Sequence, residues 1–320
     1  MKTVLVSGAS GVIGYGILRS IRKSNLNIKL IGTTIYQDSP AQGFCDIFEL
    51  APKTIESGYI DWLVQTIEKH KVDLIIPGIE VDMYYWAEKF EEISKSGVKI
   101  VLNRPELISL CKDKWLFYEH LLRTEPLYAI KTSLNRNFEE LSDILGVPFL
   151  LKPRRGHGSK GIVRVDSQQA FSIYSMLVGS ELMAQTLVGS DENEFSSSAF
   201  CNGEGEFNAS MSLRRRLSNG GFTEKAEVVN SGEINEALGR LTRVYKPIGP
   251  TNFQFRLHEN GLKLLEINPR ISSATSIRTA FGYNESEMAI NYYLDKIEPS
   301  QPKIRQGRAV RYFEDLIFYK

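Results

Sequence analysis

Residues 264–270 read Leu-Leu-Glu-Ile-Asn-Pro-Arg, an apolar run that leads into an acid, an amide, a proline and an arginine. The run predicts a strand, and on a strand Glu266 and Asn268 are two positions apart, so both side chains lie on one face. The preceding predicted strand carries Gln254, which can face this pair. Three oxygen ligands on one face suit Mg²⁺, whose octahedron nucleotide phosphates and water can complete. Arg270 can contact a phosphoryl group during its transfer; the alternative is a polar strand face that ends at a proline.

A glycine-rich loop lies about a hundred residues upstream. Residues 148–152 predict a strand that ends in Lys152, and the chain then reads Pro-Arg-Arg-Gly-His-Gly-Ser-Lys-Gly to residue 161. Glycines in such a loop free backbone N–H groups to face phosphate oxygens. No Gly-Lys-Ser/Thr opens a helix, so the loop is not of the Walker type. Lys152, Arg154, Arg155 and Lys160 supply positive charge to the loop. The alternative is a solvated basic hairpin.

A further predicted strand, residues 182–187, follows the loop and can hold a base. Its exposed backbone groups can grip an adenine edge, and the carboxylate of Glu194 can accept hydrogen bonds from ribose hydroxyls. The alternative is an amphipathic strand and a surface acid. Three consecutive arginines, residues 214–216, can bind phosphate or carboxylate. Since neighbours on a strand alternate faces, at least one of them is expected to be exposed.

The first hundred residues alternate predicted strands and helices, among them a helix over residues 84–94, which favours a parallel, doubly wound sheet. Further helices are predicted over residues 106–122 and about 285–294. The turn after the first strand carries Gly8, Gly11 and Gly14, a spacing that fits a dinucleotide-binding fingerprint. The second strand ends at Thr34 without the acid that would hold a ribose. A Rossmann-like turn without a dinucleotide is therefore favoured, and an NAD(P) oxidoreductase is the least favoured function.

Two acids, Glu80 and Asp82, follow the predicted strand at residues 73–77. The carboxyl ends of parallel strands are where open sheets bind ligands. These acids are therefore candidate substrate contacts, and loop solvation is the alternative.

In order, these motifs resemble the ATP-grasp superfamily over about residues 105–295. They look most like the group of the carbamoyl-phosphate-synthase large subunit, which has Gln at the position of Gln254 and serines after Glu-x-Asn-Pro-Arg, here Ser272 and Ser273. The resemblance implies an α/β and α+β fold. It consists of a Rossmann-like domain (1–103), an ATP-grasp N-terminal part with the glycine-rich loop (104–185) and a C-terminal part with the Mg²⁺ site (186–320).

The resemblance also implies roles for individual residues. Arg270 and Lys152 are the catalytic residues, and the three predicted metal ligands hold one or two Mg²⁺. The segment between Gly189 and Glu194 is longer than usual, which leaves the ribose to Asp191, Glu192 or Glu194. Gln185 stands where Glu is common in the superfamily. The implied ATP contacts are Lys114, Lys152, Gly156, Gly158, Ser159, Gly161, Gln185, Leu187 and Glu194.

The activity that this resemblance implies is ATP-dependent ligation of a carboxylate to an amine through an acyl phosphate, with release of ADP and phosphate. Amino-acid, peptide and amino-sugar ligases are the implied classes. A small-molecule kinase and a non-catalytic nucleotide-binding protein are the alternatives. With 320 residues the chain is expected to hold one grasp module, without a second synthase half or a glutaminase domain.

Composition narrows the expected partners. The 39 basic and 38 acidic residues nearly balance, which gives no support for a nucleic-acid footprint. No apolar stretch approaches the ~18 residues that a membrane span needs. The N-terminus lacks signal-peptide features, and the three cysteines show no ligand or disulfide spacing. We therefore expect a cytoplasmic protein that binds small molecules, and a homodimer stays open.

Overall fold

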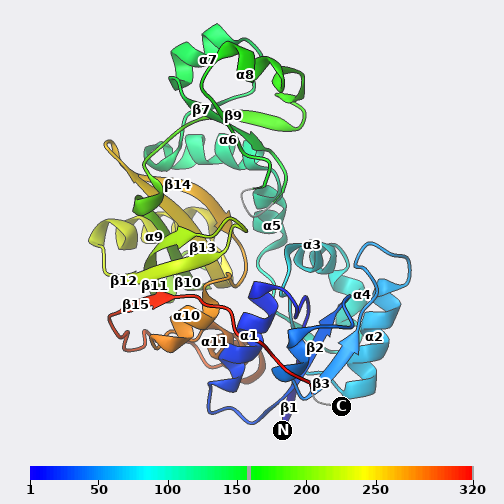
Figure 1. The fold of residues 1–320 in the computed structure, drawn as a ribbon. Helices are drawn as coiled ribbons and strands as arrows, with labels where there is room; N and C mark the ends of the chain where they lie inside the picture. Colours follow the sequence, from blue (N-terminus) through cyan, green and yellow to red (C-terminus); the bar gives the residue numbers. More distant parts are fainter. Residues whose placement is uncertain (157–159, 319–320) are drawn as a thin grey trace.

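The computed structural model describes residues 1–156 and 160–318. It contains three sheets, and Figure 1 shows the second of them, in green, at the far end of the molecule from the first, in blue. A parallel sheet followed by two antiparallel sheets confirms the predicted α/β and α+β class. No helix in the described part of the chain has the length and apolar character of a membrane span.

The first sheet is parallel, with strand order β3-β2-β1-β4-β5. Its central strands are apolar and buried, as expected for a sheet with helices on both faces. The sequence predicted one helix near residues 84–94, whereas the structure has two that meet at Lys89. The elements are β1 (Lys2–Val6), α1 (Val12–Arg22), β2 (Ile28–Thr34), β3 (Ile47–Leu50), α2 (Tyr59–His70), β4 (Leu74–Ile76), α3 (Glu80–Glu88), α4 (Phe90–Ser94) and β5 (Lys99–Ile100).

The glycine-rich turn after β1 is explained by backbone packing. A Cβ on Gly14 would lie 2.3 Å from the carbonyl oxygen of Gly8, and a Cβ on Gly78 would lie 2.1 Å from that of Ser7. A side chain at Gly14 would therefore push α1 away from the turn after β1, and one at Gly78 would push the loop after β4 away from the end of β1. The glycine spacing consequently needs no dinucleotide to account for it.

The second sheet is antiparallel, with strand order β6-β9-β7-β8. Two helices precede it where the sequence predicted one over residues 106–122. They meet at Asp113, whose carboxylate accepts from the backbone N–H groups of Trp115 and Leu116 and so caps the second helix. The elements are α5 (Pro105–Lys112), α6 (Lys114–Thr124), β6 (Thr132–Ser133), α7 (Phe138–Leu145), β7 (Phe149–Pro153), β8 (Val163–Val165), α8 (Gln168–Ser172) and β9 (Leu182–Thr186).

The third sheet is antiparallel, with strand order β14-β13-β10-β11-β12-β15. The predicted helix at residues 285–294 ends early and continues as a π-helical turn, Asn291–Asp295. The elements are β10 (Glu194–Asn202), β11 (Phe207–Leu217), β12 (Thr223–Val229), α9 (Gly232–Tyr245), β13 (Ile248–His258), β14 (Gly261–Asn268), α10 (Thr275–Ala280), α11 (Glu285–Ile290) and β15 (Arg308–Val310). Short 3-10 turns, η1 to η4, lie at Pro40–Gly43, Pro126–Tyr128, Ser175–Leu177 and Asp191–Asn193.

Helix α9, which the sequence analysis did not predict, covers one face of the third sheet. Its Leu238 and Leu241 belong to the same core as Phe253 and Phe255 of β13. Residues alternate along β13, so Gln254 lies on the opposite face. The apolar face is therefore closed by α9, and the other face of the sheet carries the polar side chains.

Candidate nucleotide and metal site

The polar face of β13 and β14 holds the three predicted metal ligands. In the antiparallel register Gln254 lies directly opposite Glu266, and Asn252 lies opposite Asn268. The Asn268 amide nitrogen donates to Glu266 Oε1 over 2.9 Å. The structure thus places a carboxylate and two amides on one face, as the strand period predicts.

Cations from three parts of the chain surround Glu266. Burial works against ionisation of this carboxyl, but Lys114, the hydrogen bond from Asn268, Lys152 and Arg270 together lower its pKa. Lys114 begins α6, Lys152 lies on β7, and Arg270 follows β14. An ionised carboxylate among three cations can hold a divalent cation together with the phosphates of a nucleotide.

Lys152 and Gln185 lie side by side on the second sheet. Lys152 Nζ donates to Gln185 Oε1 over 2.8 Å, and Gln185 Nε2 donates to the Thr132 hydroxyl over 3.0 Å. Leu187 follows directly at the end of β9. Burial lowers the pKa of Lys152 to about 8, although the charge of Glu266 opposes this shift. The lysine is therefore poised to lose its proton in mildly alkaline solution.

We expect nucleotide affinity to fall as the pH rises through about 8, because only the ammonium form of Lys152 attracts phosphate oxygens. With its pKa lowered to about 8, Lys152 is mostly charged below that pH and progressively loses its charge above it. Calorimetric titration with a non-hydrolysable ATP analogue between pH 7 and 9.5 measures the effect. Lys152→Arg keeps its charge over this range and should flatten the profile. A wild-type affinity that does not change with pH would contradict this role of Lys152.

The glycine-rich loop is tied to the start of α6. Lys114 Nζ donates to the carbonyl oxygen of Gly156 over 2.7 Å, and the Lys114 backbone N–H donates to that of Arg154 over 2.8 Å. Gly156 and Gly161 have φ values of +131° and +75°, which favour glycine. The predicted contacts Gly158 and Ser159 lie outside the described residues.

Two of the loop's basic residues are engaged within the protein. Arg154 and Arg155 both pair with the Asp113 carboxylate, at 2.9 and 2.8 Å. Burial of Asp113 favours its neutral form, yet the Arg154 hydrogen bond prevails and its pKa is lowered. In the structure these two charges therefore fasten the loop to α6, whereas the sequence showed them only as part of the loop's positive charge.

Glu194, one of three acids considered for the ribose, is buried between two arginines. Its Oε1 accepts from Nε and Nη2 of Arg215 at 3.1 and 2.8 Å, and its Oε2 accepts from Nε and Nη2 of Arg256 at 3.0 and 2.9 Å. Four N–H groups use the whole acceptor capacity of a carboxylate. Asp191 pairs with Arg256 through one oxygen, and its side chain is 79% exposed. Glu192 is similarly exposed and lies 3.6 Å from Arg216.

Arg270 joins the first domain to the third sheet. Its guanidinium pairs with the carboxylate of Glu80, the first residue of α3, and lies 3.3 Å from Asn268 Oδ1. Of the two candidate substrate acids, Glu80 is therefore at the site. Asp82 instead belongs to the interior of the first domain. It is buried, it accepts hydrogen bonds from Thr54 and Tyr59, and its pKa is raised by that burial.

Two neighbours of this cluster were not singled out from the sequence. Burial raises the pKa of Tyr84 on α3, and the charges of Glu80, Arg270 and Glu266 also act on this phenol. Burial likewise raises the pKa of the Cys111 thiol on α5, on which Glu266 also acts. Both side chains therefore border the site as neutral groups, and no sequence pattern marks either of them.

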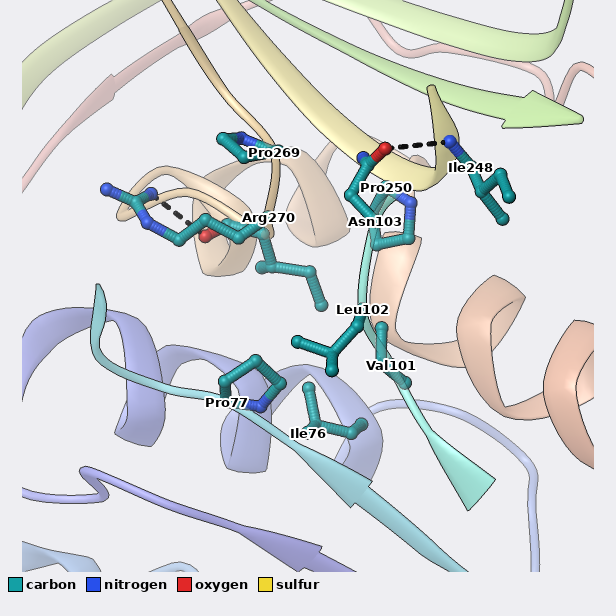
Figure 2. A pocket seen from close by; sticks show the side chains of 10 residues that line it. Ile76, Pro77, Val101, Leu102, Asn103, Ile248, Pro250, Pro269 and Arg270 are labelled. Atoms are coloured by element: carbon teal, nitrogen blue, oxygen red, sulfur yellow. Dashed lines mark hydrogen bonds between the residues drawn. The ribbon is translucent and has the colours of Figure 1, made fainter. Parts of the chain in front are cut away.

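A small hollow lies where the carboxyl ends of β4 and β5 meet the loop after β14 (Figure 2). Its cavity volume is about 10 Å³, room for about one water molecule and far below the ~300–1,000 Å³ of ordinary ligand pockets. Figure 2 shows the Arg270 guanidinium pointing away from it, and the Ile248 N–H donating to Asn103 Oδ1. The hollow is a feature of the domain junction. Its lining is Ile76, Pro77, Val101, Leu102, Asn103, Ile248, Pro250, Pro269, Arg270 and Ile271.

Comparison with known families gives this geometry a context. Residues 182–316 match the family model described as ATP-grasp in the biosynthetic pathway with Ter operon. The chain carries an ATP-grasp domain. Residues 9–101 match the PylC-like N-terminal domain, so the predicted ATP-grasp resemblance is confirmed, and with it the Rossmann-like domain that precedes the grasp.

The sequence relatives of this chain are distant. The carbamoyl phosphate synthase large chain of Methanosarcina barkeri is 25% identical over 318 residues, which cover 89% of this chain and 28% of that protein. The chain therefore spans less than a third of this relative's length. The formate-dependent phosphoribosylglycinamide formyltransferase of Prochlorococcus marinus is 24% identical, with 95% of this chain and 80% of that protein covered.

Solved structures show the same fold. N5-carboxyaminoimidazole synthetase from Staphylococcus aureus superposes with a TM-score of 0.74 at 18% identity, over 95% of this chain and 80% of that one. Biotin carboxylase from Campylobacter jejuni superposes with a TM-score of 0.73 at 17% identity, over 96% of this chain and 74% of that one.

Proposed function

We propose that this protein is an ATP-dependent ligase that phosphorylates a carboxylate and joins it to an amine, with release of ADP and phosphate. The observation that carries the proposal is the cluster around Glu266, where Lys114, Lys152 and Arg270 face one carboxylate. Such a set neutralises a transferring γ-phosphoryl group and needs little acid–base chemistry. Relatives and structural neighbours named as synthases, synthetases and carboxylases support the same reading.

The donor set fits Mg²⁺ together with ATP. Glu266, Asn268 and Gln254 offer the hard oxygen ligands that this ion prefers. In residues 1–156 and 160–318 no group of three His, Cys, Asp or Glu side chains is placed to hold a metal. The phosphates of the nucleotide would therefore supply most of the negative charge. When bound, the ion would offset the negative charge that develops on the phosphate oxygens. A structural neighbour was solved with MgADP, which supports this cofactor pair.

The nucleotide would lie between the second and third sheets. We place the triphosphate against Lys114, Lys152 and the loop that starts at Gly156, and the adenine against Gln185 and the backbone of Leu187. The ribose would lie against the acidic residues at the start of β10 and in the turn before it. Because the oxygens of Glu194 are occupied by two arginines, we assign the ribose hydroxyls to Asp191, whose carboxylate faces solvent.

The substrate carboxylate would take the place that Glu80 occupies on Arg270. One of its oxygens attacks the γ-phosphorus, the bond from phosphorus to the β,γ-bridging oxygen breaks, and ADP leaves. The amine nitrogen then attacks the acyl carbon, the phosphate leaves with the bonding electrons, and the amine gives up a proton. Glu80, displaced from Arg270, can attract the ammonium form of the amine before the ammonium loses the proton that frees its lone pair for attack.

The acyl phosphate gives this proposal its test. With the right carboxylate and ATP but no amine, added hydroxylamine should yield a hydroxamate together with ADP, because an acyl phosphate is electrophilic at carbon. The carboxylate is found first, by screening amino acids and other acids with amines for ADP release. AMP and pyrophosphate would contradict the proposal. ADP together with a phosphorylated product that hydroxylamine leaves intact would favour the small-molecule kinase.

The composition of the chain supports a proposal for its cellular location and its partners. A near-balanced charge and three free cysteines support a cytoplasmic protein whose partners are a small carboxylate and a small amine.

A further inference from the structure

The three consecutive arginines of β11 have different environments. Arg214 and Arg216 point outward, with side chains 49% and 57% exposed, and they lie next to Glu227 and Glu192. Arg215 points to the polar face of the third sheet, and its side chain is only 4% exposed. Because successive residues of a strand point to opposite faces, Arg215 is buried while its two neighbours lie on the surface.

Arg215 connects two parts of the proposed site. Its Nε and Nη2 donate to Glu194 Oε1, and its Nη2 also donates to Gln254 Oε1 over 2.7 Å. Glu194 lies on β10 and Gln254 on β13, so one guanidinium reaches across β10. A single buried cation therefore contacts both the acid near the nucleotide and an amide of the metal face.

We propose that Arg215 is a positioning residue that fixes the orientation of the Gln254 amide for Mg²⁺. An amide side chain has nearly the same shape when its oxygen and nitrogen exchange places, but only the oxygen can bind the ion. Arginine is a donor alone, so it holds the oxygen toward itself and disfavours the flipped amide, whose NH₂ group would face another donor. The carbonyl oxygen has two lone pairs. One lone pair accepts the hydrogen bond from Arg215, and the other remains free to bind the metal ion.

The contacts of Glu194 make this arrangement rigid. Its second oxygen is held by Arg256, and the Glu194 side chain is 5% exposed, so the Arg215–Glu194 pair is desolvated. The negative charge of Glu194 also offsets the charge of Arg215, which lowers the repulsion toward a metal ion bound nearby. The inference rests on the proposed magnesium site and adds a residue that acts through one of its ligands.

Manganese binding tests the inference without using turnover. Mn²⁺ is titrated by electron paramagnetic resonance into the full chain with a non-hydrolysable ATP analogue. Arg215→Met should weaken Mn²⁺ binding by about 10- to 100-fold, the usual effect of losing a partner that orients a metal ligand. Nucleotide affinity without metal should change by much less. Arg214→Met removes a neighbouring charge from the outer face and should leave Mn²⁺ binding unchanged.

Two further variants protect the test from a folding defect. Arg215→Lys keeps a charge beside Glu194 but cannot bridge to Gln254, so it should fold and still bind Mn²⁺ more weakly. In a Gln254→Glu background either carboxylate oxygen can bind the ion, so Arg215→Lys should cost far less there. Wild-type Mn²⁺ affinity in folded Arg215→Lys and Arg215→Met would overturn the inference, as would equal losses in Arg214→Met. Undiminished Mn²⁺ binding by Glu266→Gln would instead reject the proposed metal site itself.

Discussion

Glu266→Gln is expected to lower ATP turnover on the order of 10³-fold, the upper range for loss of one preorganised charge at a reacting phosphoryl group. Glu266 is the single carboxylate among the three proposed ligands, and the amide that replaces it has the same size. Lys114, Lys152 and Arg270 would then face a neutral group, so the metal would lose its anionic ligand while the fold stays intact. ADP release at saturating Mg²⁺ and substrates measures the effect.

The control for this variant is a matched exchange on the same sheet. Glu259 lies exposed in the turn between β13 and β14, and Glu259→Gln should keep wild-type turnover. Thermal unfolding of both variants checks that the fold persists. Wild-type turnover by a folded Glu266→Gln protein would remove Glu266 from the site.

Arg270→Met should lower kcat by about 10²- to 10³-fold, with a much smaller change in the KM for ATP. A guanidinium that stabilises charge during phosphoryl transfer acts mainly in the transition state, and such arginines are worth about 10³–10⁵ in rate in related chemistry. Arg270 is suited to this because, within the described residues, its buried Nε has no hydrogen-bond partner and can still donate to a ligand. Steady-state kinetics at saturating carboxylate and amine separate the two parameters.

A conservative variant sharpens this prediction. Arg270→Lys keeps the charge but loses the planar fork, so its kcat should lie between those of wild type and Arg270→Met. Equal kcat values for all three proteins, with a change in KM for ATP alone, would show that Arg270 only binds nucleotide. In that case the exchange of Glu80 for a substrate carboxylate on Arg270 would also be rejected.

Features that depend on short-range geometry could be predicted from the sequence. The two-residue period of a strand was enough to place Glu266 and Asn268 on one face, and the paired strand brought Gln254 opposite. The alternation of apolar strands with helices predicted the parallel first sheet. The resemblance of the motifs to a known family predicted the ATP-grasp fold. No sequence pattern showed that the helix over residues 106–122 is interrupted at Asp113, or that α9 covers the third sheet.

The tertiary structure decided which charges face the ligands and which face the protein. In the sequence Arg154 and Arg155 are part of the positive charge of the glycine-rich loop, yet in the structure both pair with Asp113, forty-odd residues earlier in the chain. The sequence predicted that at least one of Arg214, Arg215 and Arg216 is exposed, and the pairing of β11 with β10 decides that Arg215 is the one turned inward to Glu194.

The amino-acid sequence by itself determined the chemical groups available for the site and the strand faces that carry them, because a strand's alternation is set by local backbone geometry. It could not determine how those groups are paired. The contact between Glu80 and Arg270 joins residues 190 positions apart, and it exists because the first domain packs against the loop after β14. Long, flexible charged side chains can reach several partners. Which ion pair forms therefore depends on how distant elements pack, because that packing brings opposite charges together away from water.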